Sequence, residues 1–346
     1  MSTPQELLEK VIAHSRETAL LAATEHLLGW DERTKMPHAA GEYRAEQMTL
    51  LSGMIHQRNT DSEYGKWLDE LAASDLMADP HSNAGTIIRE SKRSRDKAVK
   101  LPQSLVEEIT RAAVQGQQAW EAARGNNDFA AFRQPLEKLL DLKRQQADAI
   151  GYVNTRYDAL LDDFEPDTTS IDVERIFRPL RDRLTPLIEE LTASPHRPGD
   201  EPFRVDLPRE QQHTFVVALL ERLGFDGEAG RLDTSAHPFS VGLGPGDTRI
   251  TTRYRSDMFL DALGSTLHEA GHGLYEQGLP KERYLGQPLG EALGLGIHES
   301  QSRLWENHVG RSRPFWEWIL PHAVEILGSR LAAFTPDDLF QACLLY

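Results

Sequence analysis

Two histidines four residues apart are the feature of this sequence best suited to chemistry. His268 and His272 flank Glu269 in the pattern H-E-x-x-H. Residues i and i+4 of a helix share one face, so both imidazoles can reach a single cation at about 2.0–2.1 Å. Glu269 lies too far round the helix to be an easy third ligand, but it is placed to contact a water on the cation. The spacing indicates a metal site, although a helix with two ordinary histidines and a solvated glutamate has the same pattern.

A catalytic zinc site of this kind takes a third protein ligand and leaves the fourth position to water. The stretch 289–309 offers Glu299, at a distance from His272 that leaves room for a loop and a returning helix. Glu299 is also spaced to form an ordinary i,i+4 ion pair with Arg303. Three other carboxylates compete for the role of ligand: Glu282, Glu291 and Glu306. Spacing alone places Glu299 only slightly ahead of Glu291.

Residues 256–278 are expected to form the helix that carries the two histidines. Apolar side chains recur there at helical spacing: Met258, Phe259, Ala262, Leu263, Leu267, Ala270 and Leu274. Ser256 is the expected N-cap and Gly278 the expected stop. A polar stripe runs through the same helix: Asp261, Ser265, His268, His272 and Glu276. Unpartnered polar groups inside an apolar helix cost several kcal/mol, and a bound metal would remove that cost.

A small sheet is expected just before that helix. Residues 203–207, 240–243 and 248–254 have strand-like patterns, and the Gly-Pro-Gly-Asp at 244–247 is a strong turn signal. We expect an antiparallel sheet whose exposed edge holds an extended peptide through main-chain hydrogen bonds. Arg249 is a candidate to grip a terminal carboxylate, or else a simple surface arginine. His237 is a candidate to line the groove or stabilise an oxyanion, or else a loop histidine.

The remaining sequence reads as helices. They are expected at residues 3–29, 40–58, 171–193, 211–223 and 314–333, with three more between 61 and 150. The predicted fold class is therefore mostly α, with the small antiparallel sheet beside the H-E-x-x-H helix. We expect a single domain over residues 1–346, with one weak internal boundary near 194–202.

Composition narrows the class of protein. The chain has 346 residues, 38 Lys and Arg against 54 Asp and Glu, and a net charge of −16. That balance argues against nucleic acid and against an anionic membrane surface as partners, because both need basic faces. A single cysteine excludes an intrachain disulfide framework and fits a reducing compartment. With no signal peptide and no apolar run of about 18 residues, we expect a cytoplasmic protein that spans no membrane.

Several motifs together resemble the thermostable carboxypeptidase Taq family of metallocarboxypeptidases. HEAGHGLYEQG and GIHESQSRLWEN carry the resemblance around the histidines. His237-Pro238-Phe239 resembles the H-P-F motif of the family, and residues 247–251 resemble its D-x-R-x-T motif. Residues 30–37, WDERTKMP, are similar to a W-D-x-x-T-x-M-P stretch. Together the matches run from residue 30 to about residue 318.

The resemblance implies roles for particular residues. His268, His272 and Glu299 would bind the metal, which is zinc or cobalt in its place, and Glu269 would be the catalytic carboxylate. The implied fold is an elongated helical one with a deep groove, usually a homodimer. The implied reaction removes the C-terminal residue of a peptide with a free carboxylate. A zinc-activated water would attack with Glu269 as general base. For Arg249 the family motif indicates only that the residue matters, and substrate binding by His237 and Arg249 is an expectation from their place beside the site.

One departure from the family is large. Its members continue into an I/V-R-x-x-A-D motif and a G-x-x-Q-D-x-H-W motif, and neither is present here. The chain instead ends in an uncapped apolar run, residues 339–346. We therefore expect a C-terminally truncated member. Two other functions stay open at this point: a folded, metal-binding but inactive homologue, and a zinc oligopeptidase or endopeptidase.

Overall fold

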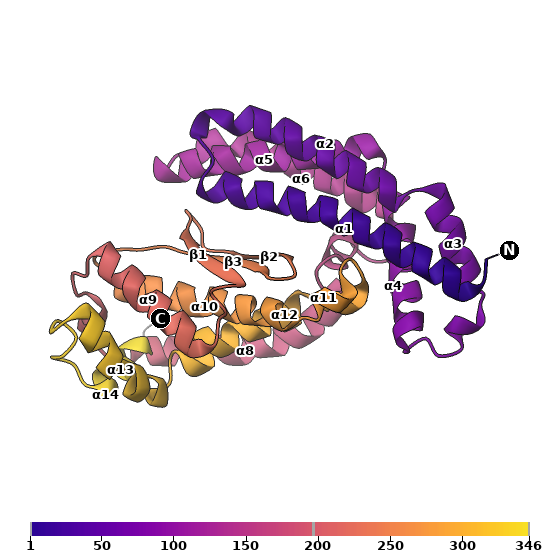
Figure 1. Cartoon of the computed structure of the whole chain (residues 1–346). Helices are drawn as coiled ribbons and strands as arrows, with labels where there is room; N and C mark the ends of the chain where they lie inside the picture. The colour runs from indigo at the N-terminus through magenta and orange to yellow at the C-terminus, as the bar shows by residue number, and fades with distance from the viewer. Residues whose placement is uncertain (1, 196–197, 345–346) are drawn as a thin grey trace. The chain divides into compact units, whose positions relative to one another are not determined.

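The computed structural model describes residues 2–195 and 198–344, and most of them are helical (Figure 1). The prediction of a mostly α fold is confirmed. The helices are α1 Pro4–Thr34, α2 Gly41–Asn59, α3 Ser62–Ala72, α4 Asn83–Ala98, α5 Gln103–Gly125, α6 Phe129–Ile150, α7 Arg156–Leu161, α8 Ser170–Ala193, α9 Arg209–Leu223, α10 Phe259–Gly278, α11 Lys281–Tyr284, α12 Leu295–Arg303, α13 Arg313–Leu327 and α14 Pro336–Cys343.

The chain divides into two compact units. One contains residues 2–166 and 279–292, with the short segment 243–245, and the other contains the remaining described residues. The expected weak boundary near 194–202 falls inside the second unit, and residues 196 and 197 of that stretch lie outside the described residues. The last two residues of the expected C-terminal apolar run, 345 and 346, also lie outside them.

The first unit is helical. Its longest helix, α1, begins with a capping box in which Glu6 N donates to Thr3 Oγ1 (3.3 Å) and Thr3 N donates to Glu6 Oε2 (2.7 Å). Figure 1 shows α1 running alongside α2, and α5 alongside α6. One apolar cluster joins α1, α3 and α4, and it includes Val11, Leu68 and Ile88. This unit carries none of the four residues of the predicted metal site.

Two expectations for the first unit were wrong in detail. Helix α1 continues to Thr34 instead of ending at residue 29. The last turn of the helix is stabilised because Trp30 is buried and Asp31 forms an ion pair with Arg44 of α2 at 2.6 Å. Residues 61–150 contain the four helices α3 to α6 and not three.

The core of the second unit forms around α10. Phe259 and Leu263 of α10 pack in one apolar cluster with Phe215 of α9 and Trp316 of α13, and all four are almost completely buried. A smaller cluster connects α10 to the sheet through Ile250. The predicted apolar face of this helix is therefore confirmed, and its burial fixes the orientation of the histidines on the same helix.

The sheet has three strands: β1 Gly230–Thr234, β2 Ser240–Gly244 and β3 Asp247–Thr252, in the order β1-β3-β2. A small sheet beside the H-E-x-x-H helix is confirmed, but it is mixed and not purely antiparallel. Strand β1 pairs in parallel with β3, with Leu232 opposite Ile250. This strand was missed because GRLDT lacks the apolar alternation by which strands are recognised.

Two other expectations near the sheet were also wrong. Residues 203–207 are no strand: a 3₁₀ turn, Glu201–Phe203, leads into a segment of irregular backbone before α9. Phe203 and Leu207 are nevertheless fully buried, because both pack into the apolar cluster around α10. Helix α10 begins at Phe259 and not near Ser256, whose carbonyl accepts from Leu207 N at 3.1 Å.

Helix α8 differs from its neighbours because none of its residues is buried. A series of apolar side chains along it is between 42% and 62% exposed: Ile176, Phe177, Leu180, Leu184, Leu187, Ile188 and Leu191. Thr169 caps the helix by accepting from Asp172 N at 3.3 Å. We call this series the α8 stripe.

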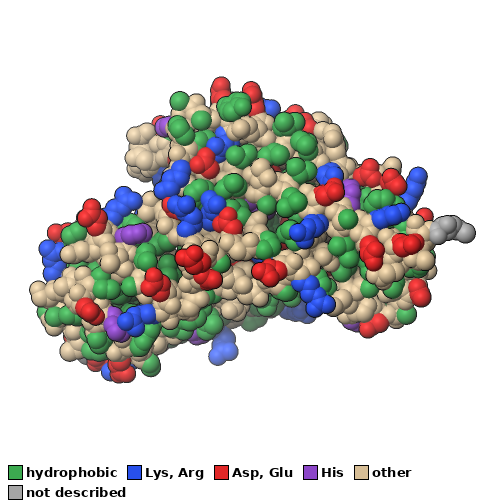
Figure 2. Space-filling view, in the orientation of Figure 1, with side chains coloured by type: hydrophobic (Ala, Val, Ile, Leu, Met, Phe, Trp, Pro, Cys, Tyr) green, Lys and Arg blue, Asp and Glu red, His purple; other side chains and the backbone are tan. Residues whose placement is uncertain are grey.

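Acidic and basic side chains are interspersed on the face drawn in Figure 2. Among residues 2–195 and 198–344, no helix combines the length and the apolarity needed to cross a bilayer.

Candidate metal centre

Three of the predicted site residues come together in the second unit. His268, His272 and Glu299 each offer one ligand atom, and these atoms all lie within 4.8 Å of one another. Nε2 of His268 lies 3.7 Å from Oε2 of Glu299, and Nε2 of His272 lies 3.8 Å from Oε1 of the same carboxylate. Of the four carboxylates considered from the sequence, Glu299 is the one that groups with both histidines.

The two helices that supply these side chains touch at a glycine. Gly271 lies inside the H-E-x-x-H turn of α10, and α12 packs against it with its backbone. A Cβ at Gly271 would lie 2.4 Å from the carbonyl oxygen of Gln301 and 2.6 Å from Cα of Ser302. Such close approach is open only to glycine, and it brings Glu299 within reach of the histidines.

Each ligand side chain is held by a second polar group. Nδ1 of His268 donates to Oε2 of Glu306 (2.8 Å), which belongs to a π-helical turn, Leu304–Val309. Nδ1 of His272 lies 2.5 Å from Nδ1 of His298. Ser302 Oγ donates to Oε2 of Glu299 at 2.7 Å. Partners of this kind orient metal ligands and set their tautomers.

Glu269 is buried beside this group, with only 5% of its surface exposed. Its Oε2 has no hydrogen-bond partner within the part of the chain that the structure describes. Burial raises the pKa of Glu269 to about 7; the charge of His268 opposes that rise, and the carboxylates of Glu299 and Glu306 add to it. A carboxyl with a pKa near neutrality can both take up and release a proton at physiological pH.

The surroundings shift the pKa values of the two histidines in opposite directions. Burial lowers the pKa of His272 to about 4, with further lowering by His298 and His268, so its ring is neutral at pH 7 and has a free lone pair. The hydrogen bond to Glu306 raises the pKa of His268, against the opposing effect of burial. Burial alone would raise the pKa of Glu299, but the Ser302 hydrogen bond and the two histidines outweigh it and lower that pKa.

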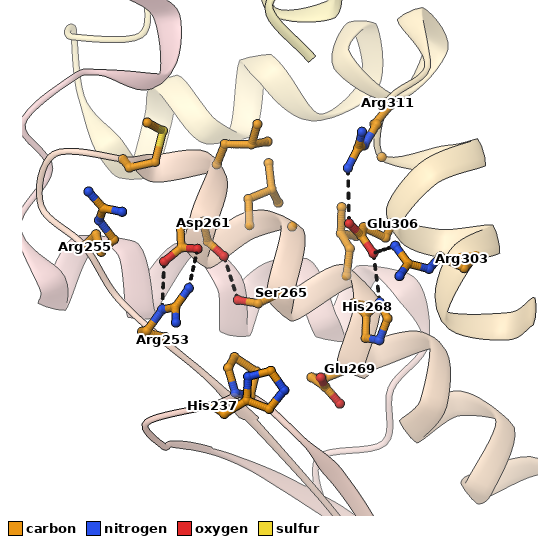
Figure 3. Close-up of a pocket in the computed structure, with 17 residues that line it drawn as sticks. His237, Arg253, Arg255, Asp261, Ser265, His268, Glu269, Arg303, Glu306 and Arg311 are labelled. Carbon is orange, nitrogen blue, oxygen red and sulfur yellow. Dashed lines mark hydrogen bonds and ion pairs between the residues drawn. The ribbon is translucent and has the colours of Figure 1, made fainter. Parts of the chain in front are cut away.

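A cavity of about 480 Å³ adjoins the histidine helix (Figure 3). His237, His268 and Glu269 all line it. Its wall also includes an ion pair in which Arg253 Nη2 lies 2.7 Å from Oδ1 of Asp261. Figure 3 shows Glu306 between His268 and Arg311, to which it is joined by dashed lines.

Arg249 is not among the residues that line this cavity. Its Nε and Nη2 each donate to a different oxygen of Asp247, both at 2.9 Å. Its substrate-binding role stays a prediction. Arg253 and Arg255, further along the same segment, are arginines that do line the cavity.

Three polar residues of the site had no correct assignment from the sequence. The sequence offers Glu306 only as a competing third ligand, yet it contacts Nδ1 of His268, the ring nitrogen that faces away from Glu299. His298 and Glu276 were given no role, yet His298 contacts His272 and its Nε2 donates to Glu276 Oε1 at 2.9 Å. One local signal existed for Glu276, since it follows His272 by one helical turn on the polar stripe.

Comparison with known proteins agrees with this site. Residues 10–344 match the carboxypeptidase Taq (M32) metallopeptidase family. Thermostable carboxypeptidase 1 of Thermus thermophilus is 40% identical over 336 residues, which cover 94% of this chain and 66% of that protein. The crystal structure of BsuCP has a TM-score of 0.92 and 30% identity, and the match covers 97% of this chain and 67% of that one.

A third relative has the same fold. The M32 carboxypeptidase from Deinococcus radiodurans R1 has a TM-score of 0.86 and 36% identity, over 97% of this chain and 67% of that chain. The chain spans between 60% and 66% of the length of the curated relatives that it matches. The family motifs, the grouped ligands and the match over almost the whole sequence agree, and the chain belongs to the carboxypeptidase Taq (M32) family of metallopeptidases.

Proposed function

We propose that this chain is a metal-dependent carboxypeptidase that hydrolyses the C-terminal peptide bond of peptides with a free carboxylate. The observation that carries the proposal is Glu269, a buried carboxylate beside three convergent ligand side chains. One of its oxygens has no hydrogen-bond partner among residues 2–195 and 198–344. Leaving such an oxygen buried without a partner is costly, and at functional sites a reacting group supplies that partner.

The residues present fit a divalent metal. Two imidazole nitrogens and one carboxylate oxygen within 4.8 Å of one another are the donor set of catalytic zinc sites, which leave one further position open. We propose His268, His272 and Glu299 as the ligands, with zinc as the metal and cobalt able to replace it. Neutral His272 and ionised Glu299 are already in the protonation states that ligands require.

The metal, when bound, would lower the pKa of a water and polarise the scissile carbonyl. The proposed work of the chain is then proton transfer by Glu269. Its carboxylate takes the proton of the attacking water and afterwards delivers that proton to the nitrogen of the leaving amine. The pKa of about 7 suits both transfers, because a base that is too strong releases the proton slowly and one that is too weak does not take it.

The direction of the reaction, removal of the last residue, is supported by the relatives and not by the metal chemistry, since H-E-x-x-H also serves endopeptidases. We propose that His237 contacts the substrate, because it lines the same cavity as Glu269. For Arg249 the proposal requires that its guanidinium exchange Asp247 for the terminal carboxylate.

We propose in addition that the chain forms a homodimer, as the resemblance to the family implies. We also propose a cytoplasmic location, which the single buried cysteine supports.

Release of the terminal amino acid from an N-blocked dipeptide tests the proposal directly. The 346-residue chain is assayed with zinc, with cobalt and after chelation, beside a Glu269→Gln variant that keeps the ligands. We expect metal-dependent release, reduced about 10²–10⁴-fold by the substitution. No release from folded, metal-loaded chain would favour the inactive homologue. Equal cleavage of a C-terminally amidated peptide would instead identify an endopeptidase or oligopeptidase.

A further inference from the structure

The ring of His272 has a partner on each side. Its Nε2 faces the other ligand side chains and lies 3.8 Å from Oε1 of Glu299. Its Nδ1 lies 2.5 Å from Nδ1 of His298, and Nε2 of His298 lies 2.9 Å from Oε1 of Glu276. The two rings and the Glu276 carboxylate thus form a short hydrogen-bonded series that ends at the candidate metal centre.

When both rings are neutral, the chemistry of the groups allows one tautomer for each histidine: it determines which ring nitrogen carries the hydrogen. An ionised carboxylate can only accept, so His298 donates from Nε2 to Glu276. A neutral imidazole has one N–H, so Nδ1 of His298 must be an acceptor. His272 then donates from its own Nδ1, and its lone pair is left on Nε2, the atom that faces Glu299.

We propose that His298 and Glu276 are positioning residues that hold His272 in the tautomer and orientation needed to bind the metal through Nε2. The inference rests on the proposed function, because it concerns how one ligand of that metal is held. His298 comes from α12, directly before the ligand Glu299, whereas Glu276 lies on α10 one turn after His272. The series therefore connects both helices of the site.

Burial strengthens the series. The side chains of His272, His298 and Glu276 are only 11%, 19% and 13% exposed. Hydrogen bonds in such surroundings meet little competition from water and polarise one another. The ring of Tyr275 packs edge-on against His298 at 5.0 Å between centroids, and restricts rotation of that ring. A ligand held in this way loses little freedom when it binds a cation.

The first test is zinc affinity, measured by competition with a chelator on the metal-free 346-residue chain. We expect His298→Ala to weaken binding about 10–100-fold, the range found when a partner of a metal ligand is removed. His298→Asn keeps a polar group near the position of Nδ1 and should restore part of the loss, and Glu276→Gln should have a smaller effect. His308→Ala, an exposed histidine on the following turn, is the matched control and should bind zinc as the unaltered chain does.

The second test reads the tautomers, which a merely structural role for His298 would not fix. Nitrogen NMR of the zinc-loaded chain with labelled histidine should show His272 protonated at Nδ1 and His298 protonated at Nε2. His298 protonated at Nδ1, or at both nitrogens, would overturn the proposal. Unchanged zinc affinity in folded His298→Ala would also overturn it, while leaving the proposed function intact. If the unaltered chain itself bound no zinc, the proposed function would fail, and the positioning role would fail with it.

Discussion

Nδ1 of His268 lies 2.8 Å from Oε2 of Glu306, on the opposite side of the ring from Glu299. The carboxylate accepts a hydrogen bond from Nδ1–H, so a neutral His268 has its lone pair on Nε2, the nitrogen that faces Glu299. Glu306 is fixed in turn by Arg303 at 3.0 Å and Arg311 at 3.2 Å. The two histidines are thus held from outside by different groups, one by a carboxylate directly and the other through a second imidazole.

The first prediction concerns Glu306. Glu306→Gln removes the charge that orients His268, and we expect zinc affinity to fall about 10–100-fold. Chelator competition on the metal-free chain measures the change. Glu317→Gln, an exposed glutamate on α13, is the matched control and should leave the affinity unchanged. Equal affinities for Glu306→Gln and the unaltered chain would show that the carboxylate does not act on the site.

The second prediction concerns pH and the metal-free chain. The pKa of Glu269 is raised from 4.5 to about 7 in the folded state. Below 4.5 the carboxyl is protonated whether the chain is folded or unfolded; as pH rises through 7, the folded chain must carry a buried charge, and stability is lost. Glu269→Gln should therefore become more stable than the unaltered chain as pH rises, by on the order of 2–3 kcal/mol, at about 1.4 kcal/mol per pKa unit.

Urea unfolding of both proteins in a chelator, from about pH 4.5 to about pH 7.5, measures that difference. His272 has a depressed pKa of about 4, so its own contribution is present above its unfolded pKa and is lost as pH falls. That contribution occurs in both proteins and largely cancels in the comparison. A stability difference that stayed constant with pH would contradict the raised pKa.

The third prediction concerns the glycine between the two helices. Gly271→Ala places a methyl group 2.4 Å from the Gln301 carbonyl oxygen, and the helices must separate. We expect about 1–3 kcal/mol of lost stability, together with weaker zinc binding because Glu299 moves with α12. A Cβ at Gly264 on the same helix would have no described residue within 4 Å, so Gly264→Ala should not destabilise, since alanine favours helix. If the two variants had the same stability, the close contact between Gly271 and the backbone of α12 would not contribute to the stability of the fold.

The fourth prediction concerns the apolar core beneath the site. Leu263 is fully buried, and Leu263→Ala should lower the free energy of unfolding by about 2–5 kcal/mol. Leu293→Ala, at a leucine that is 76% exposed, should change it by less than about 0.5 kcal/mol. Denaturant unfolding of the metal-free proteins makes the comparison. Similar losses in both would mean that α10 is not packed as described.

The features that could be predicted from the sequence are those set by residues close together in the chain. The apolar period of α10 and the one-turn spacing of His268 and His272 lie within a single helix, so the pattern alone predicts which side chains share a face. The turn signal at residues 244–247 likewise located β2 and β3. Glu299 was selected through the family motif, because sequence distance alone did not separate it from Glu291.

What could not be predicted depends on contacts between segments. The role of His298 requires α12 to approach α10 at Gly271, and no local pattern states how closely two helices pack. Strand β1 forms through parallel pairing with β3, so its own residues carry little of the signal. Phe203 and Leu207 alternate like a strand, but hydrogen-bonded pairing depends on a neighbouring chain segment and not on the alternation.

The α8 stripe has a practical consequence for work with this protein. Monomeric soluble proteins seldom leave a long apolar strip open to water, and association removes such a strip from solvent. In concentrated solution, copies of the chain should therefore adhere to one another, to dye molecules and to the walls of a vessel. Purification and storage call for dilute samples, and light scattering before each assay would keep aggregates from being counted as dimers.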